Sequence, residues 1–352
     1  LFPIVLAFAL FRRRGASFAA IFAALLAVIP IQLGYARLAW DPTAVPTVMV
    51  LALAAATRMS ISATALTFGL CLWTHPTTVF AAPILIAPWI AARWPRDRDA
   101  GIRWPSTRVL ALGGSCVIVS LALLYALAAL GVLPTPVRGA LRGLPARILD
   151  RLTSPASAAQ FALLYAEFIA GPTIYRYVTG SMPKLAAWLH VAGASALLAL
   201  VVPGLRRLPS STRATDRAVA IGLGLSLVLA YLLGGLRVLE PQTERYGMFL
   251  VVPTCYVLAT CIEAFATSPG HAAIGRAATG IVGAILLASF VVYFLGPLHR
   301  PDPARHVTYR TGDVDPKRGA IAEILAHRSQ ERATVVSVED WWIYWPLRYL
   351  AG

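Results

Sequence analysis

Charged and polar side chains gather in one short stretch, EPQTERYGMFLVVP, which runs from Glu240 to Pro253 and leads directly into an apolar run. Charges are unfavourable at membrane depth, so Glu240, Glu244 and Arg245 belong at a water boundary, where they can face a polar ligand. The planar fork of Arg245 can hold a phosphate at two points, which favours an anionic lipid headgroup as the ligand. Alternatively, Arg245 and Tyr246 anchor a helix end in the membrane interface.

Three other candidate residues stand near predicted turns. Asp41 can act as a general base or a metal ligand in a partly desolvated cleft, although the proline and threonine after it also form an ordinary helix start. His75 can contact a polar headgroup or shuttle a proton, or it can be structural. Arg176 lies between two tyrosines, so it either binds phosphate or belongs to an aromatic belt at the membrane interface.

Motifs that bind nucleotides or catalytic metals are missing from this sequence. It contains no phosphate-cradling glycine loop, no HExxH and no nucleophile elbow, which argues against chemistry driven by a nucleotide. A group donor must therefore come from the membrane, or the protein transports something. Cys71, Cys116, Cys255 and Cys261 all lie in apolar runs without metal-ligand spacing, so we expect them to be packing residues rather than disulfide partners or ligands.

The elements that must position these residues are membrane helices. Apolar residues make up 58% of the 352 residues, charged residues make up 13%, and the mean hydropathy is +0.69. Long uncharged runs recur without the alternation of a barrel strand, and helices satisfy every backbone amide internally. The net charge of +15 comes from basic residues in short loops, a pattern that indicates membrane topology rather than nucleic-acid binding.

The apolar runs predict an all-α polytopic bundle with about ten crossings over residues 1–297. The Arg-rich short loops are expected on the cytoplasmic side, and Asp41, His75 and the Glu240 stretch on the outer side. The expected helices are Leu1–Phe11, Ala16–Leu33, Pro46–Thr57, Ile61–Trp73, Thr77–Ala92, Val109–Leu133, Lys184–Pro203, Ala218–Leu236, Gly247–Ala266 and Ile274–Pro297.

Two segments depart from this pattern. Residues 134–183 hold no run long enough to cross a membrane, and their arginines recur at spacings near four, which predicts helices on the outer membrane surface. Residues 298–352 carry charges throughout and predict the start of a soluble α/β module, with a helix at Lys317–Arg328 and a strand at Ala333–Val338. Because Leu1 lies inside an apolar run, we also expect further chain before it.

Four stretches, in order, resemble the GT-C superfamily of polytopic glycosyltransferases that use polyprenyl-phosphate sugars. The likeness is to the branch of protein mannosyltransferases and aminoarabinose transferases. The stretches are YARLAWDPT (Tyr35–Thr43), THPTTVFAAP (Thr74–Pro83), LYAEFIAGPTIYRYV through KLAAWL (Leu164–Leu189) and ERYGMFLVVP (Glu244–Pro253).

This resemblance implies inverting transfer of a sugar from a polyprenyl-phosphate donor to a lipid, glycan or protein acceptor. The reaction would take place at the outer face of a bacterial inner membrane. The family's main catalytic Asp would precede residue 1, and Asp41 would be a second acid; as a single Asp it speaks against a bound divalent metal, and no cofactor is expected. Donor phosphate would bind Arg245 and Tyr246, with Arg176 second. The substrate cleft would include Glu240, Glu244, His75 and Arg37.

Two other classes compete with this interpretation. Transporters and lipid or glycan flippases place polar groups near the bilayer midplane, often in two similar halves, whereas the polar residues here gather on one face and no half repeats. A noncatalytic membrane scaffold would fit an incomplete active site. Membrane lipids are expected partners under all three interpretations, and nucleic acid under none.

Overall fold

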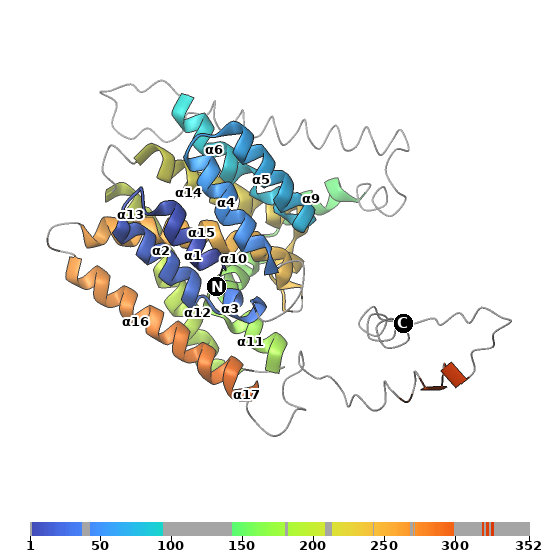
Figure 1. Cartoon of the computed structure of the whole chain (residues 1–352). Coiled ribbons are helices and arrows are strands. Elements are labelled where there is room, and N and C mark those ends of the chain that lie inside the picture. The colour runs from blue at the N-terminus through green and yellow to red at the C-terminus, as the bar shows by residue number, and fades with distance from the viewer. Residues whose placement is uncertain are drawn as a thin grey trace, which may run out of the picture.

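The computed structural model describes residues 2–36, 43–93, 143–179, 182–207, 213–241, 243–267, 270 and 272–298, with a few positions between 319 and 326. Every regular element in this part of the chain is helical (Figure 1). The elements are α1 (Phe2–Phe11), α2 (Ala16–Val28), α3 (Pro30–Tyr35), α4 (Val45–Thr57), α5 (Ile61–Thr74), η2 (Pro76–Ala81), α6 (Ala82–Arg93), α9 (Leu144–Thr153), α10 (Pro155–Ala170), α11 (Pro172–Thr179), α12 (Lys184–Ala199), α13 (Val201–Arg207), α14 (Arg213–Leu229), η3 (Ala230–Gly234), η4 (Leu236–Val238), η5 (Glu244–Leu250), α15 (Val251–Ala266), α16 (Ala272–Phe290), η6 (Val291–Leu295) and α17 (Gly296–Leu298).

Helix α15 forms the centre of the bundle. Its residues are apolar around the whole circumference, and a helix of that kind is stable only when it is buried on all sides. Helix α15 continues η5, and almost every residue of the combined helix Glu244–Ala266 is buried. Phe249, Val251 and Cys255 are 0% exposed. Helices α2, α4, α13, α14 and α16 pack against it (Figure 1).

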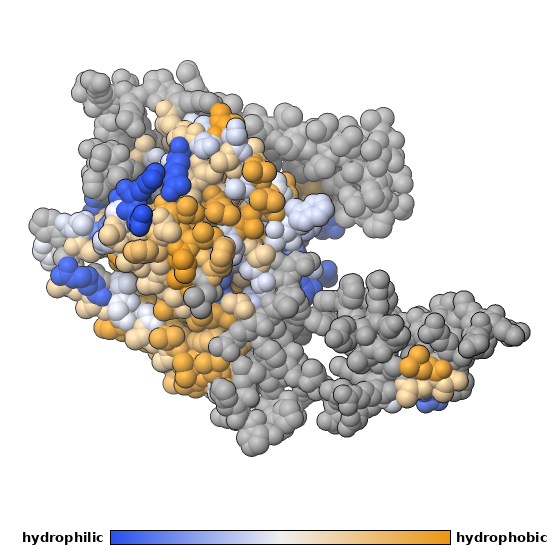
Figure 2. All heavy atoms as spheres, in the orientation of Figure 1, coloured by the Kyte–Doolittle hydropathy of each residue, from blue (hydrophilic) through white to orange (hydrophobic). Residues whose placement is uncertain are grey.

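Within the described residues, three helices are long and apolar enough to cross a membrane: Lys184–Arg207, Ala214–Gly234 and Glu244–Ala266. Large hydrophobic side chains are exposed both on these spans, such as Trp188 of α12, and on shorter apolar helices, such as Phe2 and Val5 of α1. In Figure 2 the face of the bundle is mostly hydrophobic, with hydrophilic residues toward its edges. Lipid is the solvent that favours such a surface, so the helices indicate a membrane protein.

Helices occupy the predicted ranges where the structure describes them, but several differ in where they begin, break or end. The expected helix Ala16–Leu33 breaks at Ile29, because Pro30 has no N–H to donate and begins the separate helix α3. Helix α14 begins at Arg213 rather than Ala218, which brings Asp216 into the helix. Glu244 was predicted in a loop but begins the 3₁₀ helix η5. The predicted crossing Val109–Leu133 lies outside the described residues.

The Arg-rich turns meet at one end of the bundle. Arg58, after α4, donates to the carbonyl of Leu10 near the end of α1. Arg217 of α14 donates to the carbonyl of Leu205 in α13, at 3.1 and 3.2 Å. We call the end of the bundle that carries Arg58, Arg217 and the carbonyls of Leu10 and Leu205 the arginine end. These residues are far apart in the sequence, and tertiary packing brings them together.

Three short helices, α9 to α11, occupy the described part of the segment predicted to lie on the membrane surface. None of them is long and apolar enough to count as a candidate span. Arg151 of α9 donates to the carbonyls of Tyr231 and Leu232, at 3.1 and 2.6 Å, in the π-helical turn η3 that ends α14. Arg151 thus binds carbonyls at the C-terminal end of this helix, where the Tyr231 carbonyl also accepts from the backbone N–H of Gly235 at 2.9 Å. That these helices lie on a membrane surface stays a prediction.

The predicted soluble module after residue 298 is described at only a few positions. The residues described between 319 and 326 are helical, within the range predicted for the helix Lys317–Arg328. The predicted strand Ala333–Val338 lies outside the described part of the chain. The α/β character of this module therefore remains an expectation from sequence.

Candidate functional site

The end of the bundle opposite the arginine end holds a group of polar side chains from three separate parts of the chain. We call these residues, Tyr35, His75, Thr77, Glu244, Arg245 and Tyr246, the Glu244 cluster. Glu244 is completely buried at the start of η5, and the hydroxyl of Tyr35, at the end of α3, donates to its Oε1 at 3.0 Å. A buried carboxylate requires hydrogen-bond donors, and Tyr35 supplies one from a helix more than 200 residues away in sequence.

Thr77, which lies in η2, links His75, which precedes that helix, to the backbone of η5. Its Oγ1 donates to the carbonyl of Tyr246 at 2.9 Å and lies 2.7 Å from Nδ1 of His75. The His75 ring also lies 5.4 Å from the Tyr246 ring, centre to centre. The THPTT and ERYG stretches, which the sequence analysis treated separately, therefore form one structure.

Arg245 follows Glu244 but is only partly buried, so its guanidinium reaches the boundary of the bundle. The guanidinium carbon lies 5.2 Å from the centre of the Tyr246 ring, within the range of a cation–π contact. This ring contact restricts the orientation of the Arg245 side chain. This geometry is compatible with an arginine that binds an anion at the edge of the bundle.

Arg176, the second predicted phosphate ligand, is engaged with a carboxylate of the protein. Its two terminal nitrogens donate to the two carboxylate oxygens of Glu167, at 2.8 and 3.1 Å. The preceding residue, Tyr175, is buried and bonds Ser289 of α16 at 2.9 Å; burial raises the pKa of its phenol, which keeps it protonated. The guanidinium that was predicted to bind phosphate therefore makes a bidentate contact with the carboxylate of Glu167.

The remaining predicted site residues contribute less to the described geometry. Asp41 and Arg37 lie outside the described residues. Glu240 is half-buried, and its backbone carbonyl accepts from the backbone N–H of Thr243 at 3.1 Å, so it shapes the turn before η5. In the described part of the chain no group of three or more His, Cys, Asp or Glu side chains could hold a metal ion, and Cys71, Cys255 and Cys261 are buried free thiols.

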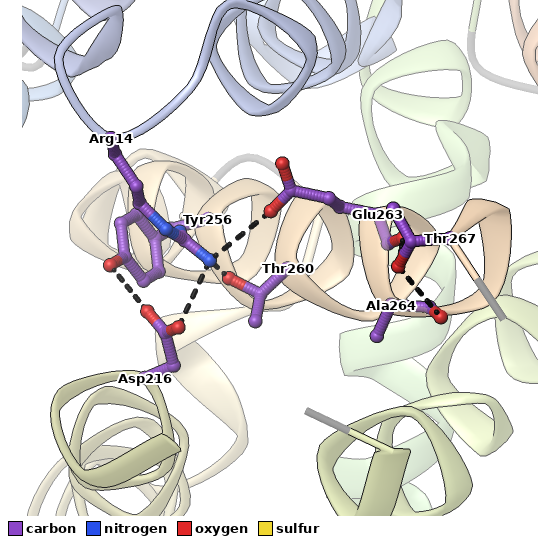
Figure 3. Close-up of polar contacts among 7 residues, drawn as sticks. All are labelled: Arg14, Asp216, Tyr256, Thr260, Glu263, Ala264 and Thr267. Atoms are coloured by element: carbon purple, nitrogen blue, oxygen red, sulfur yellow. Dashed lines mark hydrogen bonds and ion pairs between the residues drawn. The ribbon is translucent and has the colours of Figure 1, made fainter. Parts of the chain in front are cut away.

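A second polar cluster, absent from the sequence-based candidates, lies at the arginine end (Figure 3). Arg14, in the turn between α1 and α2, donates to Asp216 at 3.0 Å and to Thr260 at 3.1 Å, and lies 3.6 Å from Glu263. Tyr256 donates to the other oxygen of Asp216 at 2.8 Å. We call these five residues the Arg14 cluster.

Stacking also holds the Arg14 guanidinium in place, because its central carbon lies 3.5 Å from the centre of the Phe18 ring. Asp216 is 3% exposed, so its charge depends on Arg14 and Tyr256 for compensation. The sequence signal for this cluster was present but weak. It consisted of acidic residues near the ends of two predicted helices, on the same predicted side as Arg12 to Arg14.

The two clusters lie at opposite ends of the central span. Glu244 begins the span Glu244–Ala266, and Glu263 lies in its last turn. At about 1.5 Å per residue the two carboxylates are separated by roughly 30 Å, the thickness of the hydrocarbon core of a bilayer. Charge is therefore placed where the ends of a crossing helix would meet water.

The fold and the two clusters define a helical membrane protein with polar residues concentrated at both ends of a buried central helix. Comparisons with family models, with curated proteins and with solved structures found no match.

Proposed function

We propose that this protein is a membrane glycosyltransferase that moves a sugar from a polyprenyl-phosphate donor to an acceptor hydroxyl at the end of the bundle that carries the Glu244 cluster. One observation carries the proposal. Two of the stretches that resemble GT-C enzymes, THPTT and ERYG, meet through Thr77 and Tyr246, and Tyr35, the first residue of a third, bonds Glu244. Residues that share a reaction must be close in space, whatever their distance in sequence.

In the proposed reaction a base removes the proton of the acceptor hydroxyl, whose oxygen attacks the anomeric carbon of the sugar. The bond from that carbon to the phosphate oxygen breaks, and the lipid phosphate leaves with the electron pair. Arg245 stabilises the negative charge that develops on this phosphate, in a site with little water to screen it. Glu244 and Tyr246 orient Arg245 through η5, and Asp41 is the candidate base within this sequence.

The finer features of the proposal concern topology. The protein would cross a bacterial inner membrane about ten times, with the arginine end in the cytoplasm and the Glu244 cluster outside. The positive-inside rule supports this orientation, because Arg12, Arg13, Arg14, Arg58, Arg206 and Arg207 all lie in the turns of the arginine end. Residues 298–352 would then begin a soluble module on the outer side.

A transporter or flippase is less well supported by the described residues. Such proteins bind their cargo with polar groups near the bilayer midplane, on interrupted helices. Here the two carboxylates Glu244 and Glu263 lie toward the ends of the span Glu244–Ala266, and Val257, Leu258 and Ala259 between them are buried and apolar. A scaffold without activity would not require the buried Glu244.

The test is sugar transfer in lipid nanodiscs from a panel of polyprenyl-phosphate hexoses and pentoses. We expect Arg245→Ala to lower turnover by about 100-fold, as the loss of one donor to an oxyanion does in other enzymes. Arg237→Ala is the matched control, because Arg237 is an exposed arginine of the neighbouring turn η4 and should leave turnover unchanged. A folded Arg245→Ala protein with full turnover would assign Arg245 to interfacial anchoring instead.

A further inference from the structure

The contact between α9 and the turn η3 is made in both directions. Nη1 of Arg151 donates to the backbone carbonyls of Tyr231 and Leu232, at 3.1 and 2.6 Å. The hydroxyl of Tyr231 donates in return to the backbone carbonyl of Arg151, at 2.8 Å. The Tyr231 ring also lies 5.2 Å from the ring of Phe161 in α10, centre to centre. Each of the two side chains thus holds the backbone of the other element.

Gly235, which follows η3, leaves room for the guanidinium of Arg151. The φ of Gly235 is +71°, in the left-handed region that glycine adopts without strain. A Cβ built on Gly235 would lie 2.7 Å from the central carbon of the guanidinium. A residue with a side chain would therefore both strain the backbone and displace Arg151. The turn η3 is also π-helical, a conformation that is frequent at functional sites.

The turn that Arg151 holds begins the stretch of chain that leads to Arg245. Two backbone hydrogen bonds follow one another along this stretch. The N–H of Glu240 donates to the carbonyl of Leu236, and the N–H of Thr243 donates to the carbonyl of Glu240, both at 3.1 Å. Successive turns are therefore joined from η4 to the residue before η5.

The short helix η4 and the residue after it also pack directly on η5. A Cβ built on Gly247 of η5 would lie 3.0 Å from the carbonyl oxygen of Val238 and 2.8 Å from Cδ2 of Leu239. Val238 and Leu239 are buried, at 3% and 0% exposure. Such a close approach leaves η5 little freedom to move unless η4 moves with it.

We infer that Arg151 is a positioning residue for Arg245. It holds η3, and η3 continues into η4, which packs on η5, the turn that carries Arg245. The inference rests on the proposed function for its effect on the reaction, because a displaced Arg245 no longer faces the phosphate charge that it is proposed to stabilise. Arg151 acts through the backbone and not by contact with the donor.

The competing role of Arg151 is local. In that role it only attaches α9 to the end of α14, since basic side chains commonly bind the last carbonyls of a helix. Its loss would then loosen α9 and leave η4 and η5 in place. The two roles predict different sets of backbone amides that open to solvent, and these can be measured without any substrate.

The first measurement is hydrogen–deuterium exchange of the protein in nanodiscs, because exchange rates report local opening of the backbone. We expect Arg151→Ala to speed exchange in residues 236–250 by about 10-fold, the effect of losing a hydrogen bond from a charged donor. Exchange in residues 251–266 of α15 should stay unchanged. Arg237→Ala is the matched control, since Arg237 is an exposed arginine of η4 whose loss should leave exchange unchanged.

Tyr231→Phe is a milder variant that keeps the ring and every charge and loses only the hydroxyl. It should speed exchange in residues 236–250 by about 3-fold, the effect of losing one neutral hydrogen bond. Faster exchange in α9 alone would overturn the role of Arg151 in fixing η5. If Arg151→Ala speeds exchange in the whole protein, Tyr231→Phe decides: faster exchange in residues 236–250 with α15 unchanged supports the coupling, and any other pattern overturns it.

A double-mutant cycle with Gly235→Ala tests the geometry of the contact. Gly235→Ala alone adds the strain of the positive φ and the clash with Arg151, whereas in the Arg151→Ala background only the strain remains. Its effect on exchange in residues 236–250 should therefore be smaller in that background. Equal effects in the two backgrounds would overturn the placement of the guanidinium against Gly235.

The second measurement uses the transfer assay with the panel of polyprenyl-phosphate sugars. Arg151→Ala should lower kcat by about 10-fold and change KM by less than about 3-fold, because Arg245 acts mainly on charge that develops in the transition state. A folded Arg151→Ala protein with native kcat would overturn the positioning role. If the native protein transfers no sugar from any donor, the proposed function fails, and hydrogen exchange still decides whether Arg151 fixes η5.

Discussion

At the scale of single residues, two arginines that look equivalent in the sequence differ in their surroundings. Arg176 and Arg245 each stand beside a tyrosine near a predicted membrane boundary. Arg176 is held by both oxygens of Glu167, whereas Arg245 lies against the Tyr246 ring at the edge of the bundle. A guanidinium that already holds a carboxylate has fewer donors for a phosphate. The bidentate contact with Glu167 therefore weighs against Arg176 as the ligand of the donor phosphate.

The Arg14 cluster gives a prediction about stability at this scale. Arg14→Met should destabilise the protein by about 3 kcal/mol, because it leaves Asp216 and Glu263 without the cation they share. Adding Asp216→Asn to this variant should recover part of the loss, because it removes the more deeply buried of the two carboxylates. Unfolding in mixed micelles, titrated with SDS, measures both changes.

The control for this comparison is Arg13→Met in the same turn. Arg13 is exposed, so its replacement should change stability by less than about 0.5 kcal/mol. Equal effects of Arg13→Met and Arg14→Met would show that the ion pairs contribute nothing specific. Additive effects of Arg14→Met and Asp216→Asn would contradict the coupling.

At the scale of the elements, close helix contacts depend on glycine. A Cβ built on Gly222 of α14 would lie 2.7 Å from the Cα of Ile84 and from the carbonyl oxygen of Pro83, both backbone atoms of α6. Small residues allow helix backbones to approach in this way, a common feature of membrane helix pairs. The α6–α14 pair has the most extensive contact in the described bundle. It holds α6, which follows His75 and η2 in the chain, against α14, which precedes η3, η4 and η5.

This contact predicts that Gly222→Ala destabilises the protein by about 1–3 kcal/mol, because α6 must move to accept the methyl group. Gly224→Ala is a matched control in the same helix, since a Cβ there meets nothing within 4 Å. Both changes bring the same gain in helix propensity, so the difference between them isolates the clash. Thermal unfolding in detergent should rank Gly222→Ala below the native protein and Gly224→Ala at or above it.

At the scale of the whole molecule, the arrangement of charge predicts sidedness. Arg206 in α13 and Arg237 in η4 are both exposed and belong to opposite ends of the bundle. In a variant without its native cysteines, Arg237→Cys should react with a membrane-impermeant maleimide in intact cells. Arg206→Cys should react only after the cells are permeabilised. Labelling of both positions from one side would contradict the proposed topology and remove the basis for an outer site.

The helical class and most helix positions can be predicted from the sequence alone, as can the concentration of polar residues near helix ends. This is possible because apolar runs and charge placement follow directly from the difference between lipid and water. The break after α2 was also readable in principle, since Pro30 cannot continue the hydrogen bonding of the helix.

The pairing of the polar residues, in contrast, is visible only in the three-dimensional structure. Glu244 pairs with Tyr35, Arg176 pairs with Glu167, and Arg14 gathers Asp216 and Glu263. These partners are separated by up to 249 positions in the chain (Arg14 to Glu263), and no local periodicity reports which helices lie side by side. Which helices become neighbours is set by packing contacts, such as that of Gly222 with the backbone at Ile84, and the fit of each contact depends on the rest of the bundle.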